Sequence, residues 1–296
     1  LWWSPDSKYL AYLRFDETLV SEYSMMYYDS TLYPQVYSYK YPKAGEVNSV
    51  VSLHVFDLGR EKTVTVDTGK ETDQYIPRVL WSPSGALCYL RENRLQNHLE
   101  ILEANPVTGV SRLVLEEKDA CYIEEPTDWY ITFLGDGKRF IIPSERSGYR
   151  QLYLCDWEAK EAPRPVTTGE DEVIEVYGYS LKTQRLYYRA YDESPLRTAL
   201  FSIKTDGTGK VRMSEERGTN SAWFNSAFTY YIQTYSSITQ VPQISLHSID
   251  GKKLRLLEDN KALKEKLRDY QLPLATDSYP VIMPEGGLDI IPFGQG

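Results

Sequence analysis

The sequence lacks the features that define several large classes of protein. No apolar run in its 296 residues approaches the roughly 20 residues of a membrane-spanning helix. Its first residues carry no basic segment followed by an apolar one, so we expect any export signal to lie outside this sequence. Basic clusters are also lacking, and the net charge of -9 repels phosphate backbones, which argues against nucleic acid as the main ligand.

Recognisable catalytic motifs are missing as well. There is no Gly-x-Ser-x-Gly nucleophile elbow, no His-Glu-x-x-His zinc motif, and no glycine-rich phosphate loop. The only three histidines, His54, His98 and His247, fall at similar places in a repeat described below, so we interpret them as structural. We therefore expect no catalytic residue, no substrate-binding residue that can be assigned, no metal site and no cofactor in this chain.

Cysteine is scarce. Cys88, Cys121 and Cys155 cannot all pair, and their spacing matches neither a zinc site nor a Cys-x-x-Cys motif. We expect all three to be small buried apolar side chains.

Tyrosine, by contrast, is abundant, with 25 copies against 8 Phe and 6 Trp, and it suits half-buried strands. A unit of four strands recurs five times: a strand, a turn with Ser-Pro or Asp-Gly, an aromatic second strand, an alternating third strand, then a turn and a fourth strand. The expected second strands are Tyr9–Phe15, Ala86–Arg91, Arg139–Pro143, Arg185–Tyr191 and Thr229–Tyr235. The third strands begin near Leu53, Leu99, Leu152, Leu200 and Ile244, about 44 to 53 residues apart.

Four strands in each period of about 45 residues are typical of a β-propeller. Helical repeats are shorter, and no helical pattern occurs within these units. The sequence therefore predicts an all-β fold with about five four-stranded blades in residues 1–258.

The first repeat contains an insertion. Its second and third strands are separated by about 30 residues more than in later repeats, which predicts an inserted arm at about residues 17–47. The arm has little core of its own in which to bury large rings, so we interpret it as a contact with a second copy of the chain in a homodimer. The alternative is an arm that packs on its own propeller. The arm tyrosines are Tyr23, Tyr27, Tyr28, Tyr33, Tyr37, Tyr39 and Tyr41.

The last part of the chain, residues 259–296, departs from the repeat. Leu263 and Leu267 lie four residues apart between charges, which predicts a short amphipathic helix over Lys261–Tyr270, opened by Asp259 or Asn260 at its cap. The Pro- and Gly-rich stretch Leu272–Gly296 is expected to be an irregular exit segment towards another domain.

Three pairs of adjacent carboxylates could bind a substrate ammonium. We favour solvated edges for all of them, although one pair precedes an expected inner strand at Trp129–Phe133 and could reach a central tunnel. The pairs are Glu116-Glu117, Glu124-Glu125 and Glu215-Glu216.

Several stretches together carry a family resemblance. The run Tyr-Pro-Lys-Ala-Gly-Glu-Val-Asn is the most specific of them. In their order along the chain they resemble the dipeptidyl peptidase IV family of prolyl oligopeptidase-like serine peptidases. The stretches are Leu1–Tyr12, Glu22–Ser24, Tyr41–Asn48, Ser144–Tyr153 and Leu257–Leu263.

This resemblance implies an eight-bladed propeller, of which this chain holds the later blades, and an α/β-hydrolase domain with a Ser-Asp-His triad. Such an enzyme releases N-terminal dipeptides with Pro or Ala second. We expect the amine-binding glutamate pair before Leu1 and the triad after Gly296, so this chain alone is expected to be inactive. The family's dimerisation arm falls at the position of the insertion. The segment Tyr122–Asp128 corresponds to one that carries an aromatic pocket residue in the family, but no residue here can be assigned to it.

The chain has no Asn-x-Ser/Thr sequon, which favours a bacterial enzyme exported to the periplasm or cell surface. In the leading interpretation, the chain is the propeller of a peptidase and gates and positions its peptide substrates. The alternative is a non-catalytic propeller that serves as a binding or interaction module. Sequence beyond both ends of the chain would separate these two interpretations.

Overall fold

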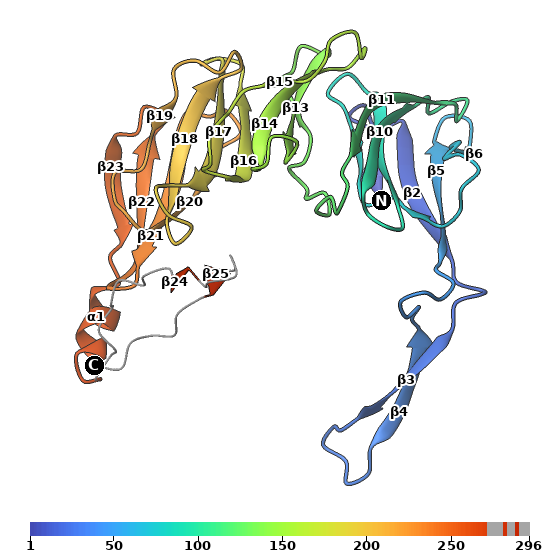
Figure 1. Ribbon diagram of the computed structural model, residues 1–296, viewed down its shortest axis with the longest axis horizontal. Helices are drawn as coiled ribbons and strands as arrows, with labels where there is room; N and C mark the ends of the chain where they lie inside the picture. The colour runs from blue at the N-terminus through green and yellow to red at the C-terminus, as the bar shows by residue number, and fades with distance from the viewer. Residues whose placement is uncertain (271–280, 283–287, 290–296) are drawn as a thin grey trace. The chain divides into compact units, whose positions relative to one another are not determined.

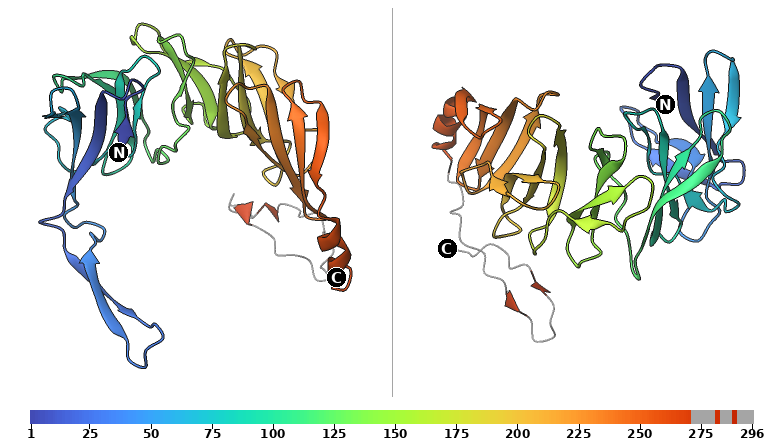
Figure 2. Two further views of the ribbon diagram at one scale, coloured as in Figure 1. Left: turned by 180° about the vertical axis from the view of Figure 1, so that it is seen from behind. Right: turned by 90° about the horizontal axis from the view of Figure 1, so that it is seen from above.

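The computed structural model describes residues 1–270, 281–282 and 288–289. The chain forms two compact units, Leu1–Thr168 and Gly169–Gly296. Among the described residues, the regular elements of both units are antiparallel strands apart from one short helix, as Figures 1 and 2 show.

The first unit contains three sheets of the repeating type. The first sheet has the order β1-β2-β5-β6, the second β11-β10-β9-β7 with β8 also on β9, and the third β12-β13-β14-β15. Their strands are β1 (Trp2–Trp3), β2 (Tyr9–Asp16), β5 (Val50–Asp57), β6 (Lys62–Thr65), β7 (Gln74–Tyr75), β8 (Val79–Trp81), β9 (Leu87–Asn93), β10 (His98–Ala104), β11 (Ser111–Lys118), β12 (Thr132–Phe133), β13 (Arg139–Ser144), β14 (Gln151–Asp156) and β15 (Arg164–Pro165).

The second unit contains two more sheets, with the orders β16-β17-β18-β19 and β20-β21-β22-β23. Their strands are β16 (Val173–Ser180), β17 (Arg185–Tyr191), β18 (Thr198–Lys204), β19 (Val211–Arg212), β20 (Thr219–Phe224), β21 (Tyr230–Ser237), β22 (Gln240–Ser248) and β23 (Lys253–Glu258). The predicted all-β fold with five propeller blades is therefore confirmed. Every predicted second and third strand is present within a few residues of its expected bounds.

The alternating sequence of the strands explains why both faces of a blade can be buried. Successive side chains of a strand point to opposite faces. In β9, Leu87 and Tyr89 pack in the core shared with the first sheet, whereas Cys88 and Leu90 pack in the core shared with the third sheet. The apolar cores of the first unit thus lie between neighbouring blades.

A side-chain acceptor closes the turn before the second strand in several blades. The Ser4 hydroxyl accepts hydrogen bonds from the backbone N–H groups of Lys8 and Tyr9, and Ser82 accepts one from Ala86. Asp136 and Asn225 do the same in later blades, where each accepts two backbone N–H groups. Short polar side chains are favoured in turns for this reason.

Two inner strands differ from the regular pattern. In the second sheet the inner strand is split into β7 and β8 around Pro77, which has no N–H to donate to the ladder. In the third sheet the predicted inner strand Trp129–Phe133 is reduced to Thr132–Phe133, because Tyr130 instead closes a turn by donating its N–H to the carbonyl of Thr127.

The insertion between β2 and β5 forms a two-stranded hairpin, β3 (Glu22–Tyr27) and β4 (Gln35–Lys40). Figure 1 shows it extending from the ends of β2 and β5. Its strands pair with each other in the register Tyr23 opposite Tyr39 and Met25 opposite Tyr37.

Helix α1 (Lys261–Leu267) is shorter than the predicted Lys261–Tyr270. The N–H groups of Arg268, Asp269 and Tyr270 bond to carbonyls three residues back, so the chain tightens into turns there. The predicted cap position is confirmed at Asn260, although its side chain makes no capping hydrogen bond. Asn260 occupies the cap position but its side chain donates to the carbonyl of Pro242, and Asp259 instead accepts the N–H of Lys261.

Beyond the helix, β24 (Val281–Ile282) pairs with β25 (Leu288–Asp289). The remainder of the predicted exit segment Leu272–Gly296 lies outside the described residues.

Candidate active-site cavity

A cavity of about 70 Å³ opens at the ends of β11 and β13 in the first unit. Three segments line it: the end of β11 with Glu117, the loop that follows through Tyr130, and the turn after β13 that carries Arg146 and Arg150. The cavity therefore combines two guanidinium groups, several carboxylates and aromatic rings within one blade pair.

Glu117 organises the polar wall of this cavity. Its side chain is only 12 % exposed and one of its oxygens lies 2.6 Å from Nη2 of Arg146. The hydroxyls of Tyr130 and Ser144 also donate to this carboxylate, Tyr130 at 2.8 Å. Burial, together with the negative charge of Glu117, raises the pKa of Tyr130 well above its usual value, so the phenol remains a donor.

The two arginines are held by further contacts. The Arg146 guanidinium donates to the Ser144 hydroxyl at 2.9 Å and lies over the ring of Tyr153, 4.8 Å from its centroid. Arg150 pairs with Glu124 and with Glu145, the latter at 3.0 Å. Because carboxylates hold both side chains, and the Tyr153 ring also contacts Arg146, their remaining N–H groups are pre-positioned for an acceptor in the cavity.

The chemistry of this wall suits a short piece of peptide. Guanidinium N–H groups can donate to backbone carbonyl oxygens, and Glu124 and Glu117 provide negative charge. Tyr122, which is more than half exposed, and Trp129 supply apolar surface for a small side chain. The cavity can thus hold a peptide by hydrogen bonds to its backbone and apolar contact with one residue.

The structure corrects the interpretation of one carboxylate pair. Glu116 is partly exposed and pairs with Lys118, but Glu117 is not a solvated edge residue, because Arg146, Tyr130 and Ser144 enclose it. Glu124 and Glu125 are exposed residues on the cavity rim, where Glu125 lies 3.7 Å from Arg78. The two arginines of the site, Arg146 and Arg150, lie in Ser144–Tyr153, a stretch notable in the sequence only for its family resemblance.

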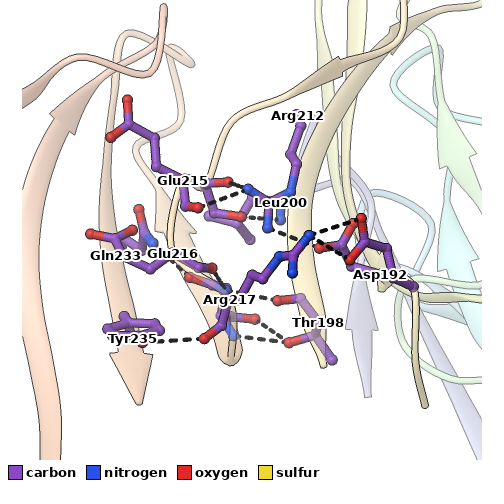
Figure 3. A network of polar contacts seen from close by, with 12 residues as sticks. Asp192, Thr198, Leu200, Arg212, Glu215, Glu216, Arg217, Gln233 and Tyr235 are labelled. Atoms are coloured by element: carbon purple, nitrogen blue, oxygen red, sulfur yellow. Dashed lines mark hydrogen bonds and ion pairs between the residues drawn. The ribbon is translucent and has the colours of Figure 1, made fainter. Parts of the chain in front are cut away.

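The third pair, Glu215-Glu216, belongs to a polar network in the second unit (Figure 3). Its backbone carbonyls accept hydrogen bonds from Arg212 and Asn220, and the ion pairs Arg212–Asp192 and Arg217–Glu193 flank them. Glu215 itself is exposed, as predicted. The network fixes the loop between β19 and β20, so we interpret it as structural.

The three histidines lie in third strands, as predicted. His54 stacks on Tyr12 with ring centroids 5.2 Å apart, and burial and the charge of Arg14 lower its pKa. His247 stacks on Tyr231 at 4.9 Å, and His98 lies 3.8 Å from the carboxylate of Glu116. Each ring contacts neighbours within its own blade.

One cysteine differs from expectation. Cys88 and Cys155 are buried free thiols, and burial raises the pKa of Cys155 to about 12. Cys121 is exposed instead, because it follows β11 in the loop beside the cavity. Among the described residues no group of three or more His, Cys, Asp or Glu is arranged to hold a metal ion. No helix within residues 1–270 is long and apolar enough to cross a membrane.

The tyrosines of the arm gather mainly on one face of the β3–β4 hairpin. The rings of Tyr23, Tyr37, Tyr39 and Tyr41 contact one another with centroids 5.6 to 6.1 Å apart. Tyr37 and Tyr41 are more than half exposed, as are Tyr27, Tyr28 and Tyr33 nearer the tip. The predicted arm residues thus form an exposed aromatic surface on the hairpin.

Comparison with known proteins gives this fold and cavity a family. The sequence matches the family model described as the dipeptidyl peptidase IV (DPP IV) N-terminal region over residues 1–242. The blades are those of a peptidase-associated β-propeller. The chain belongs to the dipeptidyl peptidase IV family, in agreement with the resemblance seen in its sequence.

Individual relatives agree with this assignment. The chain is 31% identical, over 97% of its length, to a probable dipeptidyl peptidase 4 of Arthroderma benhamiae, of which it covers 38%. It is similar in structure to the dipeptidyl peptidase 4 of Porphyromonas gingivalis, with a TM-score of 0.88 and 35% identity over 97% of this chain and 40% of that one. A putative dipeptidyl aminopeptidase IV of Bacteroides ovatus gives a TM-score of 0.77 with 25% identity over 87% of this chain and 39% of that one. The chain therefore spans about two fifths of the length of these relatives.

Proposed function

We propose that this chain is the propeller portion of a serine exopeptidase that releases N-terminal Xaa-Pro or Xaa-Ala dipeptides. The observation that carries the proposal is the family match over residues 1–242, which includes the whole cavity at Glu117 and Arg146. In this proposal the blades admit and position peptides, and the catalytic triad belongs to a hydrolase domain of the parent protein.

Within the propeller, the cavity is the proposed peptide-binding surface. Arg150 and Arg146 donate to carbonyl oxygens of the bound peptide, and Tyr122 contacts a small side chain such as proline. Their fixed geometry lowers the entropy lost on binding, because the guanidinium groups already have partners that orient them.

The test is release of p-nitroaniline from Gly-Pro-p-nitroanilide by the full-length protein and by the 296-residue chain. The full-length protein should turn over the substrate, and the isolated chain should not. Absence of turnover by a folded full-length protein would contradict the proposal and favour a non-catalytic binding propeller.

A pair of arginine variants tests the cavity separately. Arg150→Met should raise KM for the reporter about tenfold, as expected for loss of a charged hydrogen-bond donor. Arg164→Met, at an exposed arginine of β15 in the same unit, is the matched control and should leave KM unchanged. Equal KM values in the two variants would show that the cavity does not bind the substrate.

We further propose that the parent enzyme is a homodimer joined through the arm, with Tyr23, Tyr37, Tyr39 and Tyr41 at the contact. The exposed aromatic face supports this arrangement, because a tyrosine side chain buries a large apolar area and loses little conformational entropy, having few rotatable bonds.

Finally, we propose that the parent enzyme is exported to the bacterial periplasm or cell surface. The lack of Asn-x-Ser/Thr sequons in this chain supports the proposal, and fractionation of the source cells tests it.

A further inference from the structure

A second and larger cavity, of about 410 Å³, lies at the base of the arm in the first unit. Its walls come from Phe15 at the end of β2, Asn48 and Ser49 just before β5, Val51 of β5, Gln74 and Tyr75 of β7, and Glu92 and Gln96 around the end of β9. It is thus built between the first and second blades, and only Glu125 is shared with the cavity at Glu117 and Arg146.

Glu92 distinguishes this cavity from an ordinary surface hollow. The residue is 1 % exposed, yet no basic side chain among the described residues forms an ion pair with its carboxylate, and the polar side chain next to it is the neutral amide of Gln96. A buried carboxylate without a charged partner is unfavourable by several kcal/mol, so such groups are normally paired, protonated or bound to a cation.

Neighbouring basic side chains do not supply that partner. Arg91 lies 2.6 Å from Glu100, and Arg94 lies 3.1 Å from Asp73. Arg78, beside the inner strand, lies 3.3 Å from Asp128 and 3.7 Å from Glu125. Each nearby guanidinium therefore already contacts another carboxylate.

The remaining wall is suited to a positively charged organic group. The residues that line the cavity include two carboxylates, Glu92 and Glu125, and no Lys, Arg or His. The side-chain amides of Gln74 and Gln96 offer carbonyl oxygens that can accept N–H donors. Phe15 and Tyr75 provide aromatic rings, which attract cations.

We propose that this cavity is a binding site for an organic cation, a primary ammonium or a guanidinium group, with Glu92 as its buried counter-ion. The site goes beyond the proposed peptidase function and does not depend on it. The cation comes either from the basic side chain of a peptide or from a free amine, and both sources present the same charged head to Glu92.

The pH dependence of binding follows from the state of the carboxyl group. Burial raises the pKa of Glu92 to about 7, the negative Glu125 reinforces the shift, and the Gln96 amide opposes it. The carboxylate is therefore mostly ionised at about pH 8 and mostly protonated at about pH 6, and cation affinity should fall about tenfold between them.

The experiment is isothermal titration calorimetry of the full-length protein with n-butylammonium, n-butylguanidinium and Nα-acetyl-lysine amide. All measurements use one ionic strength, at about pH 8 and about pH 6. The free cations should bind at the higher pH and about tenfold more weakly at the lower one. Tighter binding of acetyl-lysine amide than of butylammonium would assign the site to peptides, and the reverse order would assign it to free amines.

Glu92→Gln should abolish binding while keeping the shape of the side chain. The matched control Glu61→Gln, at an exposed carboxylate in the turn between β5 and β6, should bind like the wild type. Neutral n-butanol should not bind to the wild type or to either variant. This comparison tests whether the ligand must carry a positive charge, even if the Glu92 variant folds poorly. Equal binding by wild type and Glu92→Gln, equal affinity at both pH values, or no binding of any cation to the wild type would each overturn the proposal.

Discussion

Arg146 and Glu117 join the ends of two strands through a contact of 2.6 Å between guanidinium Nη2 and carboxylate Oε1. The two residues are 29 positions apart in the sequence and lie in neighbouring blades. The same carboxylate accepts the hydroxyls of Tyr130 and Ser144, so one side chain connects three segments around the cavity.

Removing Arg146 should therefore destabilise the first unit. Arg146→Met leaves the largely buried Glu117 without its guanidinium, and we expect a loss of about 2 kcal/mol in the free energy of unfolding. The control is Arg217→Met, because the Arg217–Glu193 pair is exposed on both sides and should change stability by no more than about 0.5 kcal/mol. Urea unfolding followed by tryptophan fluorescence measures both. Equal losses of unfolding free energy in Arg146→Met and Arg217→Met would contradict this prediction, because they would mean that Glu117 is solvated as well as an exposed carboxylate.

The buried carboxyl of Glu92 should make stability depend on pH. Its pKa rises from an ordinary 4.5 to about 7 in the folded protein, so the folded state binds the proton more tightly than the unfolded state. The resulting stabilisation is complete below about pH 4.5 and is lost as the pH rises through about 7. Glu92→Gln should therefore match the wild type near about pH 4 and be more stable by about 3 kcal/mol near about pH 8.

This difference is measured by denaturant unfolding in buffers without amines. Glu61→Gln should show the same pH profile as the wild type, since its carboxyl is exposed. A constant offset between the Glu92 variant and the wild type across the pH range would contradict a titration at this residue.

The aromatic face of the arm should be needed for dimerisation. Tyr37→Arg places a charge among the rings of Tyr39 and its neighbours and should convert the proposed dimer of the full-length protein to monomer in light scattering. Ser38→Arg, one residue along β4, puts the same charge on the opposite face of the hairpin and should leave the dimer intact.

Deleting residues 18–43 and joining the ends with Asn-Gly provides a stronger version of this test. The deleted protein should be monomeric while its circular dichroism in the far ultraviolet keeps the strand signal. A deleted protein that remains fully dimeric would show that the arm does not join subunits.

Gly109 should tolerate no side chain. It has a φ of 75°, and a Cβ there would collide with the backbone carbonyl oxygen of Thr65 in the neighbouring blade. Gly85 has a similar φ of 87° but open space around it, so the two sites share backbone strain and differ in the clash. Gly85→Ala should cost about 1 kcal/mol and Gly109→Ala at least about 2 kcal/mol more in unfolding free energy. Thermal unfolding of both variants measures the difference, and similar melting temperatures would disprove the close approach of the two blades.

The regular part of the fold could be predicted because its signals are local. The alternation around Leu53 and the short turn acceptors at Ser4 and Ser82 each depend on residues a few positions apart. Helix α1 was predicted with its start correct and its end three residues too late, since Leu263 and Leu267 do not specify where the last turn tightens.

The cavity could not be predicted in the same way. Glu117 looked like one of several solvated carboxylates, and its burial depends on Arg146 and Ser144, which the blade arrangement brings close. Cys121 is similar, because only the position of its loop shows that it is exposed. Glu92 lies in a strand of regular pattern, and nothing in the local sequence shows that its carboxyl is buried without a basic partner among the described residues.

In four of the five blades a side-chain acceptor in the turn before the second strand affects how the chain folds. Ser4, Ser82, Asp136 and Asn225 each capture backbone groups only two to five residues away. Such contacts require closure of very short loops, which is fast and costs little entropy, whereas the cores between blades require contacts far apart in sequence. We therefore expect the hairpin of the first and second strands in these blades to appear early during folding, with the packing of blade on blade as the slower step.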